Sequence, residues 1–254
     1  MVPVRAAVFT CPRQTKEGQN IDYLPDTMKS ALSSDEFAKP EIFTIMSDSV
    51  DKPTYCCPGV RVQTCTPEEV QWVKKRNVRS TFNRIIFQRW AAARAKLVCV
   101  LEDDLRFASG WLTKALRFAE VLEKTNKPWV LALMHFYSHT SHLVHFEDVN
   151  QAGELLRWDQ QGALWGSQAY LMNRQTALTI ARIYEEKITT LPDEKRPYWV
   201  TDNGMWRMCS ILHAFDFYVP KPSLVQHIGT VSVAWPKQPP EWKTTRHFEK
   251  NQVA

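Results

Sequence analysis

Short apolar runs alternate with stretches of helical periodicity along the first half of the chain. The apolar runs predict buried strands over residues 4–10, 41–46, 60–65 and 96–101. The periodic stretches predict helices over residues 26–32, 66 to about 95 with a break near Asn77, and 110–124. The longest begins clearly at Thr66, a hydroxyl N-cap followed by Pro67 and two acids. Strands alternating with helices are typical of an α/β fold with a parallel sheet.

The second half of the chain is less regular. Its apolar runs predict strands over residues 129–134, 155–158, 165–172, 217–219 and 223–227. Helices are predicted over residues 174–187 and from 201 to about 213. Residues 235–254 are polar and proline-rich, which favours a loop or extension. We therefore expect a Rossmann-like α/β/α sandwich with a mostly parallel central sheet and an antiparallel addition.

Composition adds limits to this picture. The 254 residues are 44% hydrophobic and carry a net charge of +5, which suits a soluble domain with or without an anionic substrate. The sequence contains no run of 18 apolar residues that would predict a membrane span, and the N-terminus lacks the features of a secretory signal. We accordingly expect a cytoplasmic protein. The six cysteines lack paired metal-binding spacing, so reduced thiols are expected.

The strongest chemical signal is a buried strand that ends in Glu102, Asp103 and Asp104. Adjacent carboxylates repel one another, and their oxygens are the hard ligands that Mg²⁺ or Mn²⁺ prefers. The carboxyl ends of strands are also where open α/β sheets bind ligands. A divalent metal site is one interpretation, and a solvated turn is the other.

His227 ends another predicted strand and is followed closely by Gly229. Neutral imidazole is a good ligand for a borderline metal such as Mn²⁺, although a lone histidine in this place is often structural. Together with the acidic triplet, His227 favours the metal interpretation.

Two further segments concentrate chemistry-bearing side chains. Arg79 and Asn83 are four residues apart, hence on one helix face, and either reach donor phosphates or form a solvated basic face. Four histidines lie between residues 134 and 146, namely His135, His139, His142 and His145. We interpret this second segment as an acceptor-side loop, with a zinc site as the alternative.

Three blocks in this order resemble a GT-A glycosyltransferase. They are the N-terminal strand leading to residues 23–32, the mid-chain Leu-Glu-Asp-Asp at 101–104, and Pro-Ser-Leu-Val-Gln-His-Ile-Gly at 222–229. The motif spacing is similar to that of N-acetylglucosaminyltransferase IV-like enzymes over residues 4 to 232, although no membrane anchor or stem is visible. The resemblance implies a single catalytic domain over residues 1–234, with a nucleotide-sugar half (about 1–105) and an acceptor half (about 106–234). Residues 235–254 would be a C-terminal extension.

The resemblance also implies roles for individual residues. Asp104 and His227 would bind the metal, while Glu102 and Asp103 would face ribose and donor-sugar hydroxyls. The nucleotide pocket would be lined by residues from the first two strand ends, namely Thr10, Pro12, Arg13 and Asp48. Thr10 and Asp48 are equally compatible with ordinary turn residues.

Asp202 is the candidate general base. An inverting transfer needs a carboxylate to deprotonate the acceptor hydroxyl, and Asp202 lies at a predicted helix start. The alternative is an N-cap aspartate, a task that Thr201 could also perform. Asp159 is the second candidate for the base.

The predicted function is metal-dependent transfer of a sugar from a nucleoside-diphosphate sugar, a UDP-sugar above all, to an acceptor hydroxyl. The acceptor is either a hydroxymethylated DNA base, as for phage enzymes that modify DNA, or an intermediate of bacterial surface polysaccharide. Tryptophans and basic residues in the tail suit DNA, whose target base would be flipped out of the duplex. A different metal-dependent nucleotidyl transferase is the alternative, weakened by the absence of a GxxxxGK[ST] loop. A non-catalytic binding module would not need these carboxylates.

Overall fold

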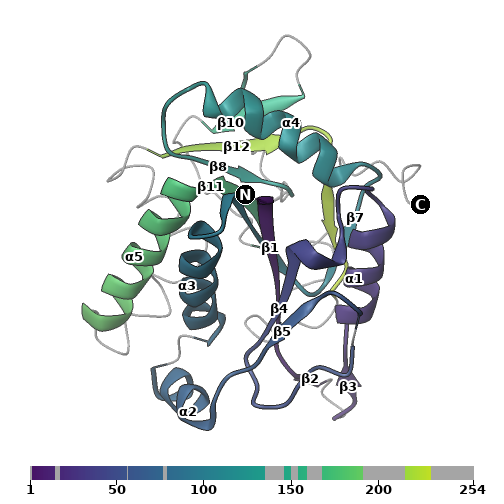
Figure 1. Cartoon of the computed structure of the whole chain (residues 1–254), viewed down its shortest axis with the longest axis vertical. Helices are drawn as coiled ribbons and strands as arrows, with labels where there is room; N and C mark the ends of the chain where they lie inside the picture. The colour runs from purple at the N-terminus through teal and green to yellow at the C-terminus, as the bar shows by residue number, and fades with distance from the viewer. Residues whose placement is uncertain are drawn as a thin grey trace.

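All predicted strands except the one over residues 223–227 join into one large sheet (Figure 1), to which an unpredicted strand at residues 146–148 is added. A computed structural model describes residues 2–14, 18–55, 57–76, 79–134, 146–149, 154–158, 168–190 and 215–229. The nine strands are, in spatial order, β5 (Arg61–Gln63), β4 (Phe43–Ser47), β1 (Val2–Thr10), β6 (Ala95–Glu102), β11 (Ala169–Asn173), β8 (Trp129–Ala132), β12 (Asp216–Pro220), β10 (Leu155–Trp158) and β9 (Phe146–Asp148).

Strand direction divides this sheet into two parts. The pairs from β5 through β4 and β1 to β6 are all parallel. Strand β11 runs antiparallel between β6 and β8, β12 is again parallel to β8, and β10 and β9 extend the edge in antiparallel fashion. The prediction of a mostly parallel sheet with an antiparallel addition is confirmed.

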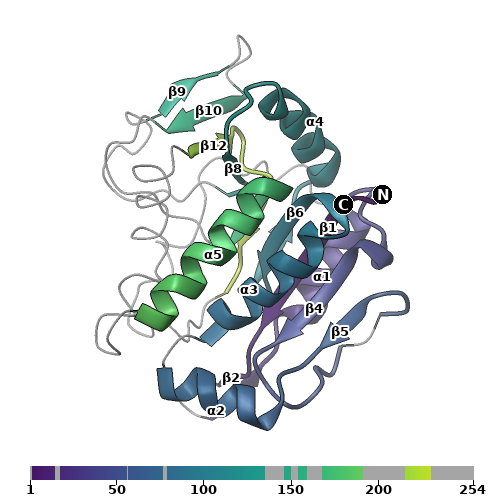
Figure 2. The same cartoon turned by 60° about the vertical axis from the view of Figure 1, so that its left-hand side comes forward.

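Helices cover both faces of the sheet. They are α1 (Leu24–Ser33), α2 (Pro67–Arg76), α3 (Arg79–Ala92), α4 (Trp111–Glu123) and α5 (Arg174–Thr190), and a 3-10 turn, η1 (Pro40–Ile42), precedes β4. Figure 2 shows α3 and α5 together on one side of the sheet, and these two helices contact each other. Helices α1 and α4 pack on the opposite face. The α/β/α sandwich is therefore confirmed.

The alternation of side chains in β1 explains why both faces are covered. Val4, Ala6 and Val8 are buried with α1 and α4, whereas Ala7 and Phe9 are buried with α3 and α5. A strand that is apolar on both sides needs a helical layer on each.

The helix boundaries follow local signals. Leu24, Thr27, Met28 and Ala31 form the buried stripe of α1 at spacings of three and four residues. At the start of α2, the Glu69 amide donates to Thr66 Oγ1 at 3.2 Å, and Glu69 Oε2 accepts from the Thr66 amide at 2.7 Å. This reciprocal pair is a capping box, and it begins the helix where the sequence predicts.

Two small sheets were not predicted. Strand β7 (Leu105–Phe107) pairs antiparallel with β13 (Val225–His227), and β2 (Arg13–Gln14) pairs with β3 (Asn20–Ile21). Both involve strands too short to produce a period-two pattern. The helix predicted from 201 and the 235–254 extension lie outside the described residues, and the predicted division into halves stays a prediction.

Two predictions from composition can be compared with the described residues. No helix among them is long and apolar enough to cross a membrane. Among the described cysteines, Cys11, Cys57, Cys65 and Cys99 form no disulfide.

Candidate active site

The candidate site lies where three parallel strands end. Strands β1, β4 and β6 end at Thr10, Ser47 and Glu102, at one edge of the sheet. The chain passes from β1 to β4 on one side and later to β6 on the other. This reversal of strand order between β1 and β6 is a topological switch point, where open α/β sheets form a ligand-binding crevice.

Helix α1 holds the acidic turn after β6 through a buried threonine. Thr27 Oγ1 donates to the Asp103 carbonyl at 2.5 Å and accepts from the Leu105 amide at 2.9 Å. One turn later, Ser30 Oγ accepts from the Phe107 amide at 2.9 Å. These bonds fix the backbone of the carboxylate turn against the helix.

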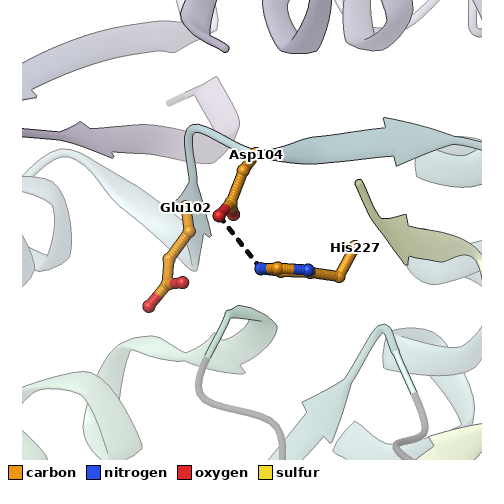
Figure 3. A group of neighbouring side chains, drawn as sticks. All are labelled: Glu102, Asp104 and His227. Atoms are coloured by element: carbon orange, nitrogen blue, oxygen red, sulfur yellow. Dashed lines mark ion pairs between the residues drawn. The ribbon is translucent and has the colours of Figure 1, made fainter. Parts of the chain in front are cut away.

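The pairing of β13 with β7 places His227 beside the turn. His227 is opposite Leu105 in the register, and the Ile228 amide donates to the Asp104 carbonyl at 2.8 Å. His227 Nε2 lies 2.9 Å from Asp104 Oδ2 (Figure 3). A Cβ on Gly229 would lie 3.0 Å from Asp104 Cβ and Cγ, and closer still to Oδ2. A glycine at 229 therefore permits this close approach.

Glu102, Asp104 and His227 form a potential metal-binding cluster, with one ligand atom from each residue lying within 4.8 Å of the others. Figure 3 shows Glu102 and Asp104 on the side of the turn that His227 approaches. The Glu102 side chain is 26% exposed, whereas those of Asp104 and His227 are nearly buried. Two carboxylates and an imidazole match the preferences of Mn²⁺, and Mg²⁺ also accepts the oxygens.

Asp103 points elsewhere, into contacts with β1 and its following loop. Its Oδ2 accepts from Thr10 Oγ1 at 2.5 Å, and its Oδ1 lies 2.5 Å from Arg13 Nη1. Burial raises the pKa of Asp103 to about 6, helped by the negative charge of Asp104 and opposed by Arg13 and the Thr10 hydrogen bond. Only 1% of this side chain is exposed, unlike the open position expected for a group that faces sugar hydroxyls.

Arg13 connects the two aspartates. Its second terminal nitrogen, Nη2, lies 3.5 Å from Asp104 Oδ2, and its guanidinium lies 5.5 Å from the centre of the Tyr23 ring. Burial lowers the pKa of Arg13, but the charges of Asp103 and Asp104 outweigh this and raise it overall. For the neighbouring Cys11 thiol, burial raises the pKa to about 12, so this group is uncharged at neutral pH.

Arg84 supports Glu102 from helix α3. Its Nη2 donates to Glu102 Oε1 at 2.9 Å, and its guanidinium lies 5.5 Å from the centre of the Phe9 ring. The Arg84 side chain is 7% exposed. Arg84 is therefore an internal counter-ion of Glu102.

Asn83 is likewise directed inward. Its Nδ2 donates to Asp48 Oδ1 at 2.6 Å and to the Ser47 carbonyl at 3.2 Å, and it lies 3.4 Å from Cys65 Sγ. The Asp48 amide in turn donates to the Thr10 carbonyl at 3.0 Å. The end of β4 is thus joined to the end of β1, with Asp48 oriented by Asn83.

The structure brings together six of the predicted site residues at the ends of β1 and β6, namely Thr10, Arg13, Glu102, Asp103, Asp104 and His227. Asp48 and Asn83 lie next to them, and Pro12 is exposed in the intervening loop. Other predicted groups fall outside the described part of the chain: Asp159, Asp202, the four histidines from 135 to 145, and the Arg79 side chain.

Sequence reasoning missed the supporting residues Thr27 and Arg84, and it noted Gly229 without its role of leaving room for Asp104. Thr27 occupies an apolar position of the α1 stripe, and a polar residue there signals a buried hydrogen bond. Arg84 carries no comparable signal, because charge alone does not distinguish a buried arginine from a surface one.

No protein-family model matches the sequence, and no curated protein is significantly similar to it. Among solved structures, CMP:2-keto-3-deoxy-manno-octonic acid synthetase complexed with CTP aligns over 85% of this chain and 88% of its own, with a TM-score of 0.46 and 9% identity. Mannose-1-phosphate geranyltransferase from Thermus thermophilus aligns over 85% of this chain and 74% of its own, with a TM-score of 0.43 and 12% identity. Similarity at this level supports no functional argument, so the fold class rests on the strand order and layers described above.

Proposed function

We propose that this protein is a metal-dependent glycosyltransferase that moves a sugar from a nucleoside-diphosphate sugar to an acceptor hydroxyl. The observation that carries the proposal is the cluster of Glu102, Asp104 and His227 at the switch point between β1 and β6. A crevice at a topological switch point is a common binding site for a nucleotide. Carboxylate ligands that leave coordination positions open for substrate are typical of a divalent cation that bridges phosphates.

The three residues of the cluster would hold Mn²⁺ or Mg²⁺. When bound, such a cation stabilises the negative charge that develops on a leaving diphosphate. The supporting contacts act before any substrate arrives: Thr27 holds the turn, Arg84 orients Glu102, and Gly229 leaves room for Asp104. Preorganised ligands of this kind lower the cost of ordering the site.

The charge balance of the site also favours an anionic donor. Three carboxylates, Glu102, Asp103 and Asp104, face two guanidinium groups, Arg13 and Arg84. With a divalent cation added, the group becomes net positive and attracts a diphosphate. Thr10, Pro12 and Asp48 belong to the adjacent strand ends and would line the nucleotide pocket.

The loop after β1 favours glycosyl transfer over the alternative of nucleotidyl transfer. A site that activates a nucleoside triphosphate often cradles its phosphates with the amides of a glycine-rich loop. Here the segment between β1 and α1, residues 11–23, contains a single glycine, Gly18, and Pro12 has no amide hydrogen to donate.

For the acid-base step we propose Asp202 as the general base that deprotonates the acceptor hydroxyl, with inversion at the anomeric carbon. Asp202→Asn should lower kcat by about 10²-fold or more while leaving donor binding nearly unchanged. An N-cap role predicts another result, since Asn caps a helix as well as Asp and both turnover and melting temperature would persist. Normal turnover in this variant would move the assignment to Asp159.

The acceptor that we favour is a hydroxymethylated base in duplex DNA, with a carbohydrate intermediate of surface polysaccharide as the second candidate. The deciding experiment incubates the full chain with Mn²⁺ and UDP-, GDP- and CDP-sugars, with hydroxymethylated or unmodified duplex, and follows nucleoside diphosphate release. We expect release from a UDP-sugar that depends on the modified duplex. Release of pyrophosphate from a nucleoside triphosphate and a sugar phosphate would instead establish nucleotidyl transfer.

A further inference from the structure

Three arginines from separate parts of the chain gather on one indole ring. The guanidinium carbons of Arg5, Arg61 and Arg94 lie 5.6, 4.9 and 5.1 Å from the centre of the Trp90 ring. Arg5 comes from β1, Arg61 from β5, and Arg94 from the turn after α3. Cation–π attraction holds each of them at the ring, and we call this group the Trp90 patch.

The Trp90 patch is separate from the candidate active site. Arg5 and Thr10 are five residues apart in β1, so about 16 Å of strand separates Arg5 from the strand end. Arg61 is level with Ala7 in the register, about 10 Å along the strand from the same end. Arg5 alternates with Val4 and Ala6 and so lies on the α3 face, on which Trp90 packs. Lys96 of the adjacent β6 is on the same face as Val98 and adds a further positive charge there.

The positive charges of the patch have no acidic partners among the described residues. Arg5 Nη1 donates to the Glu41 carbonyl at 2.5 Å and Arg94 Nη1 to the Trp90 carbonyl at 3.2 Å, and both acceptors are backbone oxygens. Arg5 Nε is buried with no hydrogen-bond partner in the described structure. By contrast, the nearby Arg89 forms an ion pair with Glu185. Because like charges repel, this concentration of guanidinium groups favours an anionic partner.

We propose that the Trp90 patch binds the phosphate backbone of a nucleic acid duplex. Arg61 and Arg94 are exposed and present planar forks that match phosphate geometry. The arginines lie over the indole, so the ring is not open to stack with an unpaired base or to insert into a lipid surface. An open surface of this kind suits a polyanion, because each neutralised phosphate releases counterions. The proposal does not depend on the chemistry at the strand ends.

The test measures binding of a labelled DNA duplex to the full chain by fluorescence anisotropy, without metal or sugar donor, over a range of KCl concentrations. The double variant Arg61→Gln and Arg94→Gln should bind more weakly, with the slope of log K against log salt reduced by about two. Arg182→Gln is the matched control, since it removes an exposed arginine on α5 and should leave binding nearly unchanged.

A charge-neutral change separates the geometry of the patch from net charge. Trp90→Leu removes the ring that gathers the arginines and should weaken duplex binding, whereas Trp90→Phe keeps an aromatic face and should retain most of it. Melting temperatures would exclude loss of folding. Absence of duplex binding by the wild type, an unchanged slope in the double variant, or an equal loss in Arg182→Gln would overturn the proposal. So would binding to phosphatidylserine vesicles in place of the duplex.

Discussion

Charged side chains are arranged in opposite ways in two regions of the sheet. At the carboxyl ends of β1 and β6, Arg13 and Arg84 are nearly buried and paired with carboxylates at distances of 2.5 and 2.9 Å. Toward the other end, Arg5, Arg61 and Arg94 surround Trp90, and no described carboxylate pairs with them. The first region arranges opposite charges inside the protein, and the second collects like charges at its surface.

This difference indicates what each region can do. Buried and paired groups have fixed positions, which chemistry at a reacting centre requires. Exposed like charges are positioned less strictly but create a field that attracts an anionic partner from a distance. Substitutions should therefore have large and local effects at the strand ends, and small, salt-dependent effects at the Trp90 patch.

The largest effect is expected for Asp104→Asn. This change removes a charged ligand from the cluster while keeping the shape of the side chain, so Mn²⁺-dependent turnover should fall by about 10³-fold or more. Isothermal titration with Mn²⁺ should show a matching loss of metal affinity. Asp26→Asn, on the exposed side of α1, is the control and should behave as the wild type. Full activity of the wild type in EDTA would exclude the metal role.

The raised pKa of Asp103 predicts a pH-dependent stability of the metal-free protein. Its pKa in the folded protein, about 6, exceeds the ordinary value of 3.8 for an aspartate side chain. The proton is thus bound more tightly by the folded state, and the stability from this group is full below about pH 4 and lost as the pH rises through 6. The loss should be roughly 3 kcal/mol, at about 1.4 kcal/mol per pKa unit. Urea unfolding between pH 4 and 7 measures it, and Asp103→Asn should flatten this part of the profile.

Gly229→Ala should damage the cluster without changing any ligand. The added Cβ would displace Asp104 or the end of β13, since it would lie 3.0 Å from Asp104 Cβ and Cγ. We expect Mn²⁺ affinity to fall by about 10- to 100-fold, as for other losses of support around metal ligands. A normal affinity with a normal melting temperature would show that the carboxylate has room to move.

The sequence predicts the strand ends well, because buried parallel strands are continuous apolar runs and their acids stand out against them. It does not predict β7, since Leu105–Phe107 is too short for a periodic pattern and its partner β13 begins at Val225. The family resemblance gives Glu102 and Asp103 the same role, facing ribose and sugar hydroxyls. In the structure, alternation along the chain directs Glu102 and Asp104 to one side and Asp103 to the other. The partners of Asp103, Thr10 and Arg13, are about ninety residues earlier, a contact that only the fold creates.

The Trp90 patch illustrates the same limit. Arg5, Arg61 and Arg94 are distant in sequence and ordinary as single charges. They meet because β5 and β1 flank β4 in the folded sheet and α3 packs against β1. Local patterns identify a basic region around α3, but they do not distinguish Arg84, which is buried, from Arg94, which is exposed.

The smallest effect provides the sharpest comparison, because one substitution can be made in both regions. Arg84→Gln leaves Glu102 without its 2.9 Å partner and removes the group over Phe9, so the free energy of unfolding should fall by about 1–3 kcal/mol. Arg61→Gln removes an exposed charge from a group of like charges and should change it by no more than about 0.5 kcal/mol. Thermal unfolding followed by circular dichroism, in low and high salt, measures both. Equal destabilisation would mean that the arginines on Trp90 are structural supports, and the distinction between the two ends of the sheet would then be wrong.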